Sequence, residues 1–180
     1  GSGREIHRVR EESQAKYANA VVIHPKSGEI LAMANSPSFD PNQYQKYAQG
    51  ILKNRLTVDV YEPGSVIKPF TLIAALDQKV VTPKMKFDCE KGRFYFHGRW
   101  IRDDIHRFDD LTVHDILVRS SNIGTVKIAQ RLAPDNWRGQ AHYLHDYLRR
   151  FGFKHFGEKT LPELPGATAG ILRPANEWQP

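Results

Sequence analysis

Residues 61–69 read Tyr-Glu-Pro-Gly-Ser-Val-Ile-Lys-Pro, and the interpretation of the whole chain depends on them. The hydroxyl of Ser65 stands three positions before the amine of Lys68. Residues 70–76 follow as an almost wholly apolar run, too apolar on all sides for a surface helix, so a buried helix is predicted there. Because positions i and i+3 of a helix share a face, Ser65 and Lys68 are expected to be neighbours.

This pair of residue types suits covalent catalysis. Burial disfavours the charged form of a lysine, so the amine of Lys68 can act as a base near neutral pH. A serine beside such a base is an activated nucleophile. A bare Ser-x-x-Lys is more often only the start of a helix whose lysine reaches solvent. The catalytic interpretation of Ser65 therefore needs support from other parts of the chain.

The length and composition fit one ordinary globular domain. The chain has 180 residues, of which 40% are hydrophobic and 26% charged, enough to bury a core. The net charge is +6, but the basic residues are scattered, which favours a generally basic surface over a nucleic-acid partner. No apolar stretch is long enough to span a membrane, and no signal peptide is visible. Residues 1–3, Gly-Ser-Gly, are typical of a cloning scar, so the natural part of the chain is expected to be residues 4–180.

The first third of the chain predicts a helix and a hairpin. Residues 4–17 are polar and charged with few apolar positions, which indicates a surface helix. Two short apolar runs, 19–24 and 29–34, flank a His-Pro-Lys-Ser-Gly turn at residues 24–28. Pro and Gly at turn positions between two such runs predict a β-hairpin.

The middle of the chain gives weaker signals. Residues 94–96, Phe-Tyr-Phe, are typical of a short strand. The one cysteine, Cys89, excludes an internal disulfide and is expected to be a small, partly buried residue. The nearby acids and histidines lack the regular spacing of metal ligands, so they are interpreted as solvated loop residues and no metal is predicted. These are His97, Asp103, Asp104 and His106.

Two more helical regions follow. Thr112 with an acid three residues later predicts the start of a short helix that runs through Val118. Polar residues 120–122, Ser-Ser-Asn, then separate it from a second apolar helix at residues 123–132, an unusual joint because such residues favour caps and turns. Residues 137–151 form the clearest amphipathic pattern, and the tail at 161–180 is typical of extended loop.

Three features together resemble the transpeptidase domain of class B penicillin-binding proteins. They are the hairpin at residues 21–33, the Tyr-Glu-Pro-Gly-Ser-Val-Ile-Lys-Pro-Phe of residues 61–70 and the Ser-Ser-Asn-Ile-Gly of residues 120–124. Residues 36–42 and 151–153 are also similar to that family. The Glu-Pro-Gly-Ser form is closer to the division-type members than to the elongation-type ones. The resemblance implies an α+β fold of the penicillin-binding and β-lactamase type.

The same resemblance implies the chemistry. Ser65 matches the acylated nucleophile, which attacks the carbonyl between the terminal D-alanines of a peptidoglycan stem peptide. Lys68 matches its base, and Ser120 matches the residue that passes the proton toward the leaving nitrogen. Asn122 matches the residue that binds the substrate's backbone amide and holds Lys68, whereas Ser121 is a variable position without a role. β-lactam antibiotics would acylate the same serine. No cofactor is implied.

The third motif of the family, Lys-Ser/Thr-Gly, is missing. Residues 26–28 match its letters but lie in the hairpin turn before the nucleophile, whereas the family motif follows the second motif on a strand, so they are rejected. The chain is therefore interpreted as the helical part of the domain plus the N-terminal hairpin of its central sheet, without the C-terminal strands. On this interpretation the 180-residue chain is expected to be inactive or very weakly acylated.

For the intact protein, the resemblance implies a cellular location and a set of protein partners. It would act on the periplasmic side of the inner membrane, anchored by an N-terminal transmembrane helix, with a membrane glycosyltransferase and division proteins as partners. A penicillin-sensing receptor domain or a β-lactamase-related protein would use the same serine differently. The lifetime of the acyl-enzyme separates a β-lactamase, which turns over rapidly, from the other two.

Overall fold

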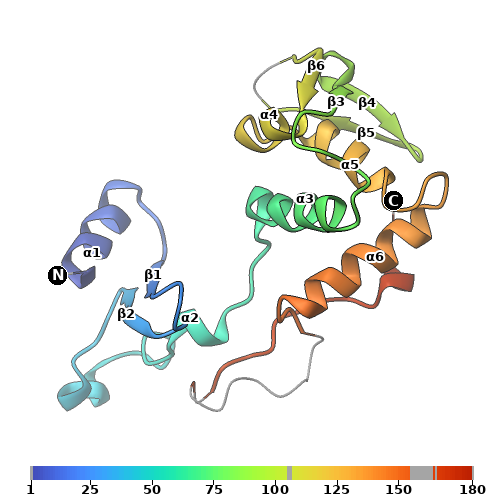
Figure 1. Cartoon of the computed structure of the whole chain (residues 1–180). Coiled ribbons are helices and arrows are strands. Elements are labelled where there is room, and N and C mark those ends of the chain that lie inside the picture. The colour runs from blue at the N-terminus through green and yellow to red at the C-terminus, as the bar shows by residue number, and fades with distance from the viewer. Residues whose placement is uncertain (1, 105–106, 155–163, 165, 180) are drawn as a thin grey trace. The chain divides into compact units, whose positions relative to one another are not determined.

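The computed structural model describes residues 2–104, 107–154, 164 and 166–179 (Figure 1). The chain divides into two compact units, which are described separately. Unit 1 comprises Gly1–Val60 and Lys159–Thr168, and unit 2 comprises Tyr61–Glu158 and Ala169–Pro180. Within the described ranges, no helix combines the length and the apolar character needed to cross a membrane.

Unit 1 is built on an antiparallel hairpin of β1 and β2, as predicted. The helix before it is shorter than predicted and ends at Glu12. Its end has a local cause, because the hydroxyl of Ser13 bonds back to the carbonyl of Val9 and Gln14 adopts a left-handed φ of 53°. The elements of unit 1 are α1 (Ser2–Glu12), β1 (Ala18–Ile23), β2 (Ile30–Ser36), the 3₁₀ turn η1 (Pro41–Lys46) and α2 (Arg55–Val58).

The turn between β1 and β2 contains the letters Lys-Ser-Gly. His24 accepts a backbone hydrogen bond from Gly28 at 2.9 Å, and the Ser27 hydroxyl lies 3.0 Å from the His24 ring nitrogen Nδ1. All three residues of the Lys-Ser-Gly sequence are exposed. Residues 26–28 therefore form a surface turn closed by local hydrogen bonds.

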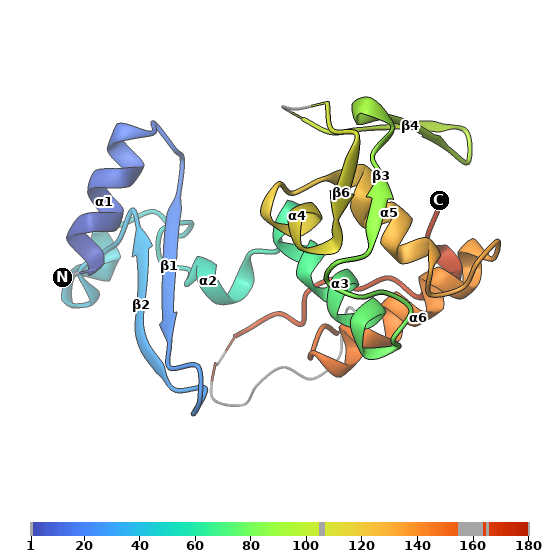
Figure 2. The same cartoon turned by 45° about the horizontal axis from the view of Figure 1, so that its top comes forward.

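Unit 2 packs helices around a small core, with two short two-stranded sheets at one end (Figures 1 and 2). The predicted strand at residues 94–96 lies in β4, and the predicted amphipathic helix is α6. Strands β3, β5 and β6 were not predicted, because three or four residues are too few to show a period. The elements are η2 (Gly64–Ile67), α3 (Lys68–Asp77), β3 (Lys86–Asp88), η3 (Glu90–Gly92), β4 (Arg93–Phe96), β5 (Arg99–Arg102), β6 (Asp110–Thr112), α4 (Val113–Val118), α5 (Asn122–Gln130), α6 (Trp137–Arg150) and η4 (Ala175–Glu177).

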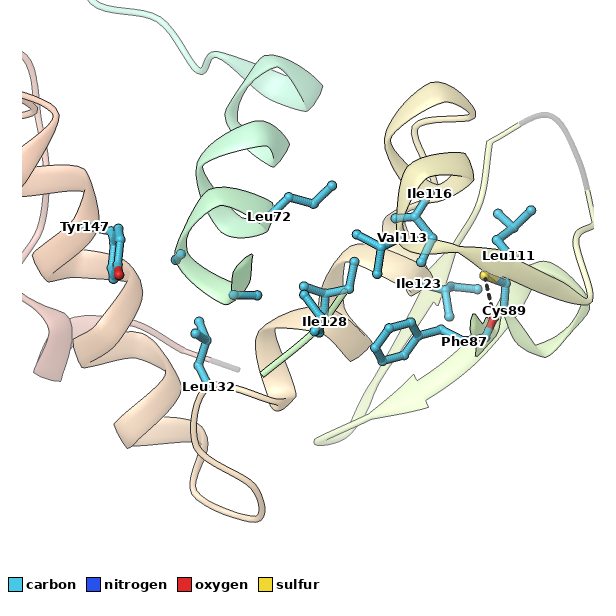
Figure 3. Close-up of a cluster of buried hydrophobic side chains, with 13 residues drawn as sticks. Leu72, Phe87, Cys89, Leu111, Val113, Ile116, Ile123, Ile128, Leu132 and Tyr147 are labelled. Atoms are coloured by element: carbon cyan, nitrogen blue, oxygen red, sulfur yellow. Dashed lines mark hydrogen bonds between the residues drawn. The ribbon is translucent and has the colours of Figure 1, made fainter. Parts of the chain in front are cut away.

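The core of unit 2 gathers side chains from α3, α4, α5, α6, β3 and β6 (Figure 3). Cys89 is fully buried within it, deeper than the partial burial predicted, and its Sγ lies 3.7 Å from the carbonyl of Phe87. Burial raises the pKa of the Cys89 thiol, so this cysteine is a core residue rather than a nucleophile. The core residues are Leu72, Ala74, Ala75, Val81, Phe87, Cys89, Leu111, Val113, Ile116, Ile123, Ile128, Leu132 and Tyr147.

Helix α3 is buried on one side only. Leu72, Ala74 and Ala75 face the core, where α3 packs against α4, α5 and α6. Ile73 and Leu76 remain 41% and 38% exposed, so the prediction of a helix buried all round was wrong for this side. An apolar composition predicts that a helix is buried, but the elements packed against the helix determine which of its faces are covered.

A close contact fixes α4 against α5. Both helices are capped by side chains, since Thr112 accepts a hydrogen bond from the backbone of Asp115 and Ser121 accepts one from that of Gly124. A Cβ placed on Gly124 would lie 2.5 Å from Cγ1 of Ile116, so only glycine permits this approach. The predicted joint between two helices at residues 120–122 is confirmed, and its geometry is set by this packing.

Candidate active site

Ser65 lies in the 3₁₀ turn η2, immediately before α3, rather than on a continuous α-helix. Gly64 adopts a φ of +62°, a conformation that favours glycine, and so lets the chain turn into η2 after Pro63. The backbone N–H of Lys68 donates to the carbonyl of Ser65, which keeps the two residues one turn apart. The side chain of Ser65 is exposed, and its hydroxyl makes no hydrogen bond with any described residue.

Lys68 is the first residue of α3, and its amine is turned inward. Lys68 as a whole is only 8% exposed. Nζ donates to the backbone carbonyl of Ser120 at 2.5 Å and contacts the Ser120 hydroxyl at 3.0 Å. Burial lowers the pKa of Lys68, while the charges of Asp103 and Asp104 oppose that change. The result is a lysine whose neutral form is more accessible than that of a surface lysine.

Ser120 connects α4 to α5 and has a left-handed backbone with a φ of 56°. This conformation is uncommon for a residue other than glycine and costs about 1 kcal/mol or more. Its backbone N–H donates to the carbonyl of Leu117 at 3.1 Å, while its own carbonyl accepts from Lys68. The side chain remains exposed. The hydroxyl of Ser120 thus contacts both the buried amine and solvent.

Ser121, to which the sequence assigned no role, is a buried helix cap. It is 1% exposed, and its hydroxyl accepts from the backbone N–H of Gly124 at 2.9 Å. The same hydroxyl donates to Oδ2 of Asp103 at 2.9 Å. The middle residue of the Ser-Ser-Asn joint therefore anchors the start of α5 to the segment that follows β5.

Asp103 was interpreted as a solvated loop residue, and that interpretation was wrong. Its carboxylate is half-buried and accepts from the hydroxyl of Ser121 and from the backbone N–H groups of Asn122 (2.6 Å) and Ile123 (3.1 Å). A carboxylate at a helix N-terminus is favoured by the helix dipole and by the unpaired N–H groups there. No local pattern could have identified Asp103, because its partners lie 18 to 20 residues further along the chain.

The neighbouring loop residues follow the prediction in part. Asp104 and His97 are exposed, as expected of solvated positions. His106 lies outside the described residues. Among the residues that the structure does describe, no group of three or more His, Cys, Asp or Glu side chains is placed to hold a metal ion.

Asn122 begins α5, and its side chain is directed to the hairpin of β4 and β5. Its Nδ2 donates to the carbonyl of Arg102 at 2.8 Å. In the described part of the chain, no hydrogen bond joins it to Lys68, the contact that the resemblance implied. The structure therefore brings Lys68 and Ser120 together, places Ser65 one turn before Lys68, and holds Asn122 next to Ser120 through the caps of α5.

The chain is similar to penicillin-binding proteins over almost its entire length. The family model described as penicillin binding protein transpeptidase domain matches residues 18–179. A probable peptidoglycan D,D-transpeptidase PbpC of Pseudomonas aeruginosa is 36% identical over 91% of this chain and 27% of its own length. The peptidoglycan D,D-transpeptidase FtsI of Escherichia coli is 32% identical over 97% of this chain and 28% of its own length.

Solved structures agree with the sequence matches. The transpeptidase domain of Burkholderia pseudomallei penicillin-binding protein 3 has a TM-score of 0.78 and 33% identity, covering 98% of this chain and 45% of that one. Penicillin-binding protein 3 of Mycobacterium tuberculosis in complex with ampicillin has a TM-score of 0.82 and 30% identity, covering 98% and 37%. These likenesses confirm the predicted mixed α and β fold of this family.

The chain spans little more than a quarter of the length of these curated relatives. The family match nevertheless covers both units and every residue of the site described above. The chain therefore belongs to the transpeptidase domain family of class B penicillin-binding proteins.

Proposed function

We propose that the intact protein is a serine D,D-transpeptidase that cross-links peptidoglycan and is acylated by β-lactams at Ser65. The observation that carries the proposal is the position of Lys68, an inward-turned lysine with a lowered pKa, one turn after an exposed serine and in contact with a second serine. These groups can supply the nucleophile, the base and the proton relay that acyl transfer requires.

In the first half of the reaction, Oγ of Ser65 attacks the carbonyl carbon of the penultimate D-alanine, and its proton passes to neutral Lys68. The resulting oxyanion collapses, the peptide C–N bond breaks, and the proton moves through Ser120 to the leaving nitrogen. Free D-alanine departs and Ser65 holds the acyl group as an ester. The contact of 3.0 Å between Nζ of Lys68 and the hydroxyl of Ser120 supports this path.

In the second half, the amine of a neighbouring stem peptide attacks the ester. A new peptide bond forms, the Ser65–acyl bond breaks, and the proton of the amine returns to the site, so that Ser65 regains its hydroxyl. The backbone N–H of Ser65 is proposed as one oxyanion donor. In other enzymes the loss of one such donor raises the barrier by about 3 kcal/mol. Asn122 is proposed to bind the stem peptide through its side-chain amide.

The wider assignments are proposals of the same kind. We propose that residues 4–180 belong to a single transpeptidase domain, which the family match across both units supports. The similarity to FtsI supports a division role, with action on the periplasmic side of the inner membrane, an N-terminal membrane anchor and partners that include a membrane glycosyltransferase and division proteins. The similarity to named D,D-transpeptidases favours this function over a sensor or a β-lactamase.

Labelling with a fluorescent penicillin tests the nucleophile. The intact protein should take up one label, and Ser65→Ala should abolish it. Ser27→Ala is the matched control, because Ser27 belongs to the exposed Lys-Ser-Gly turn and should leave labelling unchanged. Lys68→Ala should slow acylation by about 10²–10⁴-fold, the usual contribution of a general base. Unchanged labelling of Ser65→Ala would refute the assignment.

The fate of the acyl-enzyme tests the reaction class. A transpeptidase should keep the penicilloyl group for hours in the absence of an acceptor amine and should form cross-linked dimers from stem peptides. Rapid release of the label with turnover of the antibiotic would instead identify a β-lactamase. A stable label without any cross-linked product would identify a sensor.

A further inference from the structure

We propose that the outer face of the β4–β5 hairpin binds an anionic glycan chain, namely a peptidoglycan strand with its stem-peptide carboxylates, outside the acylation site. The choice of polymer rests on the proposed function. The face consists of Arg93, Tyr95, Trp100 and Arg102, which we call the hairpin face. Figures 1 and 2 show β4 at the edge of unit 2, together with its partner β5 in Figure 1.

The register of the hairpin defines this face. Arg93 pairs with Arg102 and Tyr95 pairs with Trp100, so all four side chains lie on the same side of the two strands. The opposite side carries Phe94 and Ile101, which pack against the core. The inner face holds the hairpin on unit 2, and the four residues of the outer face are exposed in the described structure.

The two aromatic rings of the hairpin face are exposed although both are large. Tyr95 is 57% exposed and Trp100 is 55% exposed, with their ring centroids 5.1 Å apart. The guanidinium of Arg93 lies over the Trp100 ring at 4.8 Å. Exposed aromatic side chains that are held by neighbours present a rigid surface at little entropic cost, and flat rings suit the C–H faces of sugars.

The hairpin face carries two like charges. Arg93 and Arg102 are directly opposite each other across the strands, and like charges in that arrangement destabilise a sheet. Among the described residues, neither arginine forms an ion pair. A carboxylate placed between them would relieve the repulsion and accept hydrogen bonds from both guanidinium groups. Charge complementarity therefore points to an anionic ligand.

The end of β5 is also tied to the candidate active site by hydrogen bonds. Asn122 donates to the carbonyl of Arg102 at 2.8 Å, and Asp103, the next residue, caps α5. A polymer lying along the hairpin would thus pass beside the residue proposed to bind the stem peptide. An exposed sheet face with two rings and two cations fits an extended chain better than a small molecule, which needs a concave site.

Co-sedimentation with purified peptidoglycan sacculi tests the proposal. The intact protein is first treated with penicillin, so that binding in the acylation cleft does not contribute. Tyr95→Ala/Trp100→Ala and Arg93→Gln/Arg102→Gln should each weaken sedimentation about tenfold. Tyr44→Ala is the matched aromatic control, because Tyr44 is 53% exposed in unit 1 and should bind as the wild type does.

Amidation of the sacculus carboxylates adds a second readout. It should lower binding of the wild type to the level of Arg93→Gln/Arg102→Gln and leave that variant unchanged. Equal binding by the wild type and both double variants would overturn the proposal and would leave the hairpin face as a surface for a protein partner. An equal loss in the wild type and the arginine variant on amidation would also overturn it.

The result of the sacculus-binding experiment does not depend on whether Ser65 is the nucleophile. Penicillin labelling of the variants reports whether Ser65 still reacts and whether unit 2 is folded. If Ser65 takes no label even in the wild type, the proposed function fails. The comparison between the wild type and the hairpin variants on sacculi still decides whether the hairpin face binds the polymer.

Discussion

Replacing Asp103 should both destabilise unit 2 and change the pH dependence of acylation. The carboxylate accepts three hydrogen bonds, from the hydroxyl of Ser121 and from the backbone N–H groups of Asn122 and Ile123. Asp103→Ala removes all three acceptor contacts. The buried hydroxyl of Ser121 then has only Sγ of Cys89, at 3.6 Å, as a weak acceptor for its proton, whereas water can reach part of the helix terminus.

The magnitude follows from these contacts. A buried donor left without a partner costs about 1–3 kcal/mol, and the loss of a negative charge at a helix N-terminus costs about 0.3–1 kcal/mol. With partial replacement by water, Asp103→Ala should lower the free energy of unfolding by about 2–4 kcal/mol. Asp103→Asn keeps one carbonyl acceptor and should lose about half as much.

Urea unfolding of the intact protein measures this loss, and Asp104→Asn is the matched control. Asp104 is the exposed neighbour of Asp103 and makes no hydrogen bond to α5 within the described part of the chain. Its replacement should change the free energy of unfolding by less than about 0.5 kcal/mol. Equal stability of Asp103→Ala and Asp104→Asn would refute the role given to the carboxylate of Asp103.

The two asparagine variants, Asp103→Asn and Asp104→Asn, test the electrostatics of Lys68. Both carboxylates raise the pKa of Lys68 against the lowering caused by burial. Removing either charge should therefore lower that pKa further, so neutral Lys68 becomes available at lower pH. The acid limb of the acylation rate should move to lower pH in Asp103→Asn and in Asp104→Asn. A limb that moves to higher pH would contradict Lys68 as the base.

Three further predictions concern packing, the buried lysine and a helix cap. Gly124→Ala should cost about 1–3 kcal/mol, visible as a lower melting temperature, because its Cβ would lie 2.5 Å from Ile116. Burial lowers the pKa of folded Lys68, so the unfolded chain binds more protons between that pKa and the ordinary lysine value. Urea unfolding across that pH window should show the wild type gaining stability relative to Lys68→Met as pH rises; a falling difference would contradict the sign. The hydrogen bond from the Thr112 hydroxyl is the main cause of the lowered pKa of Asp115, so Thr112→Ala should raise that pKa toward its ordinary value. An NMR titration of Asp115 measures the change, and an unchanged pKa would contradict the role given to Thr112.

The sequence was most informative where its signals are local. The two short apolar runs around the Pro and Gly turn predicted the hairpin, and the helical period of residues 137–151 predicted α6, because both patterns need only neighbouring residues. The site motifs were recognised by resemblance, and the family is confirmed. The roles of Ser65, Lys68, Ser120 and Asn122 stay predictions until the labelling experiments are done.

The sequence was least informative where a residue acts through distant partners. Asp103 looks like any loop acid, and its function as a cap appears only when α5 is brought beside the end of β5. Ser121 was given no role because the resemblance marks it as a variable position, and its burial against Asp103 and Cys89 could not be seen in the sequence. The exposed side of α3, with Ile73 and Leu76, was mispredicted because composition does not specify which neighbours cover a helix.

The amine of Lys68 contacts two different atoms of residue 120. The backbone carbonyl helps to hold the amine in position, and the side-chain hydroxyl is the group proposed to transfer the proton. The shorter contact, 2.5 Å, is to the backbone carbonyl, and the contact to the hydroxyl is 3.0 Å. Every amino acid offers that carbonyl, so this contact does not require the Ser120 side chain, provided that the residue at 120 can adopt the left-handed φ of 56°. Substitutions there can alter proton transfer while the base stays in place. Position 120 is thus a point at which the family chemistry can diversify without rebuilding the helix that carries the lysine.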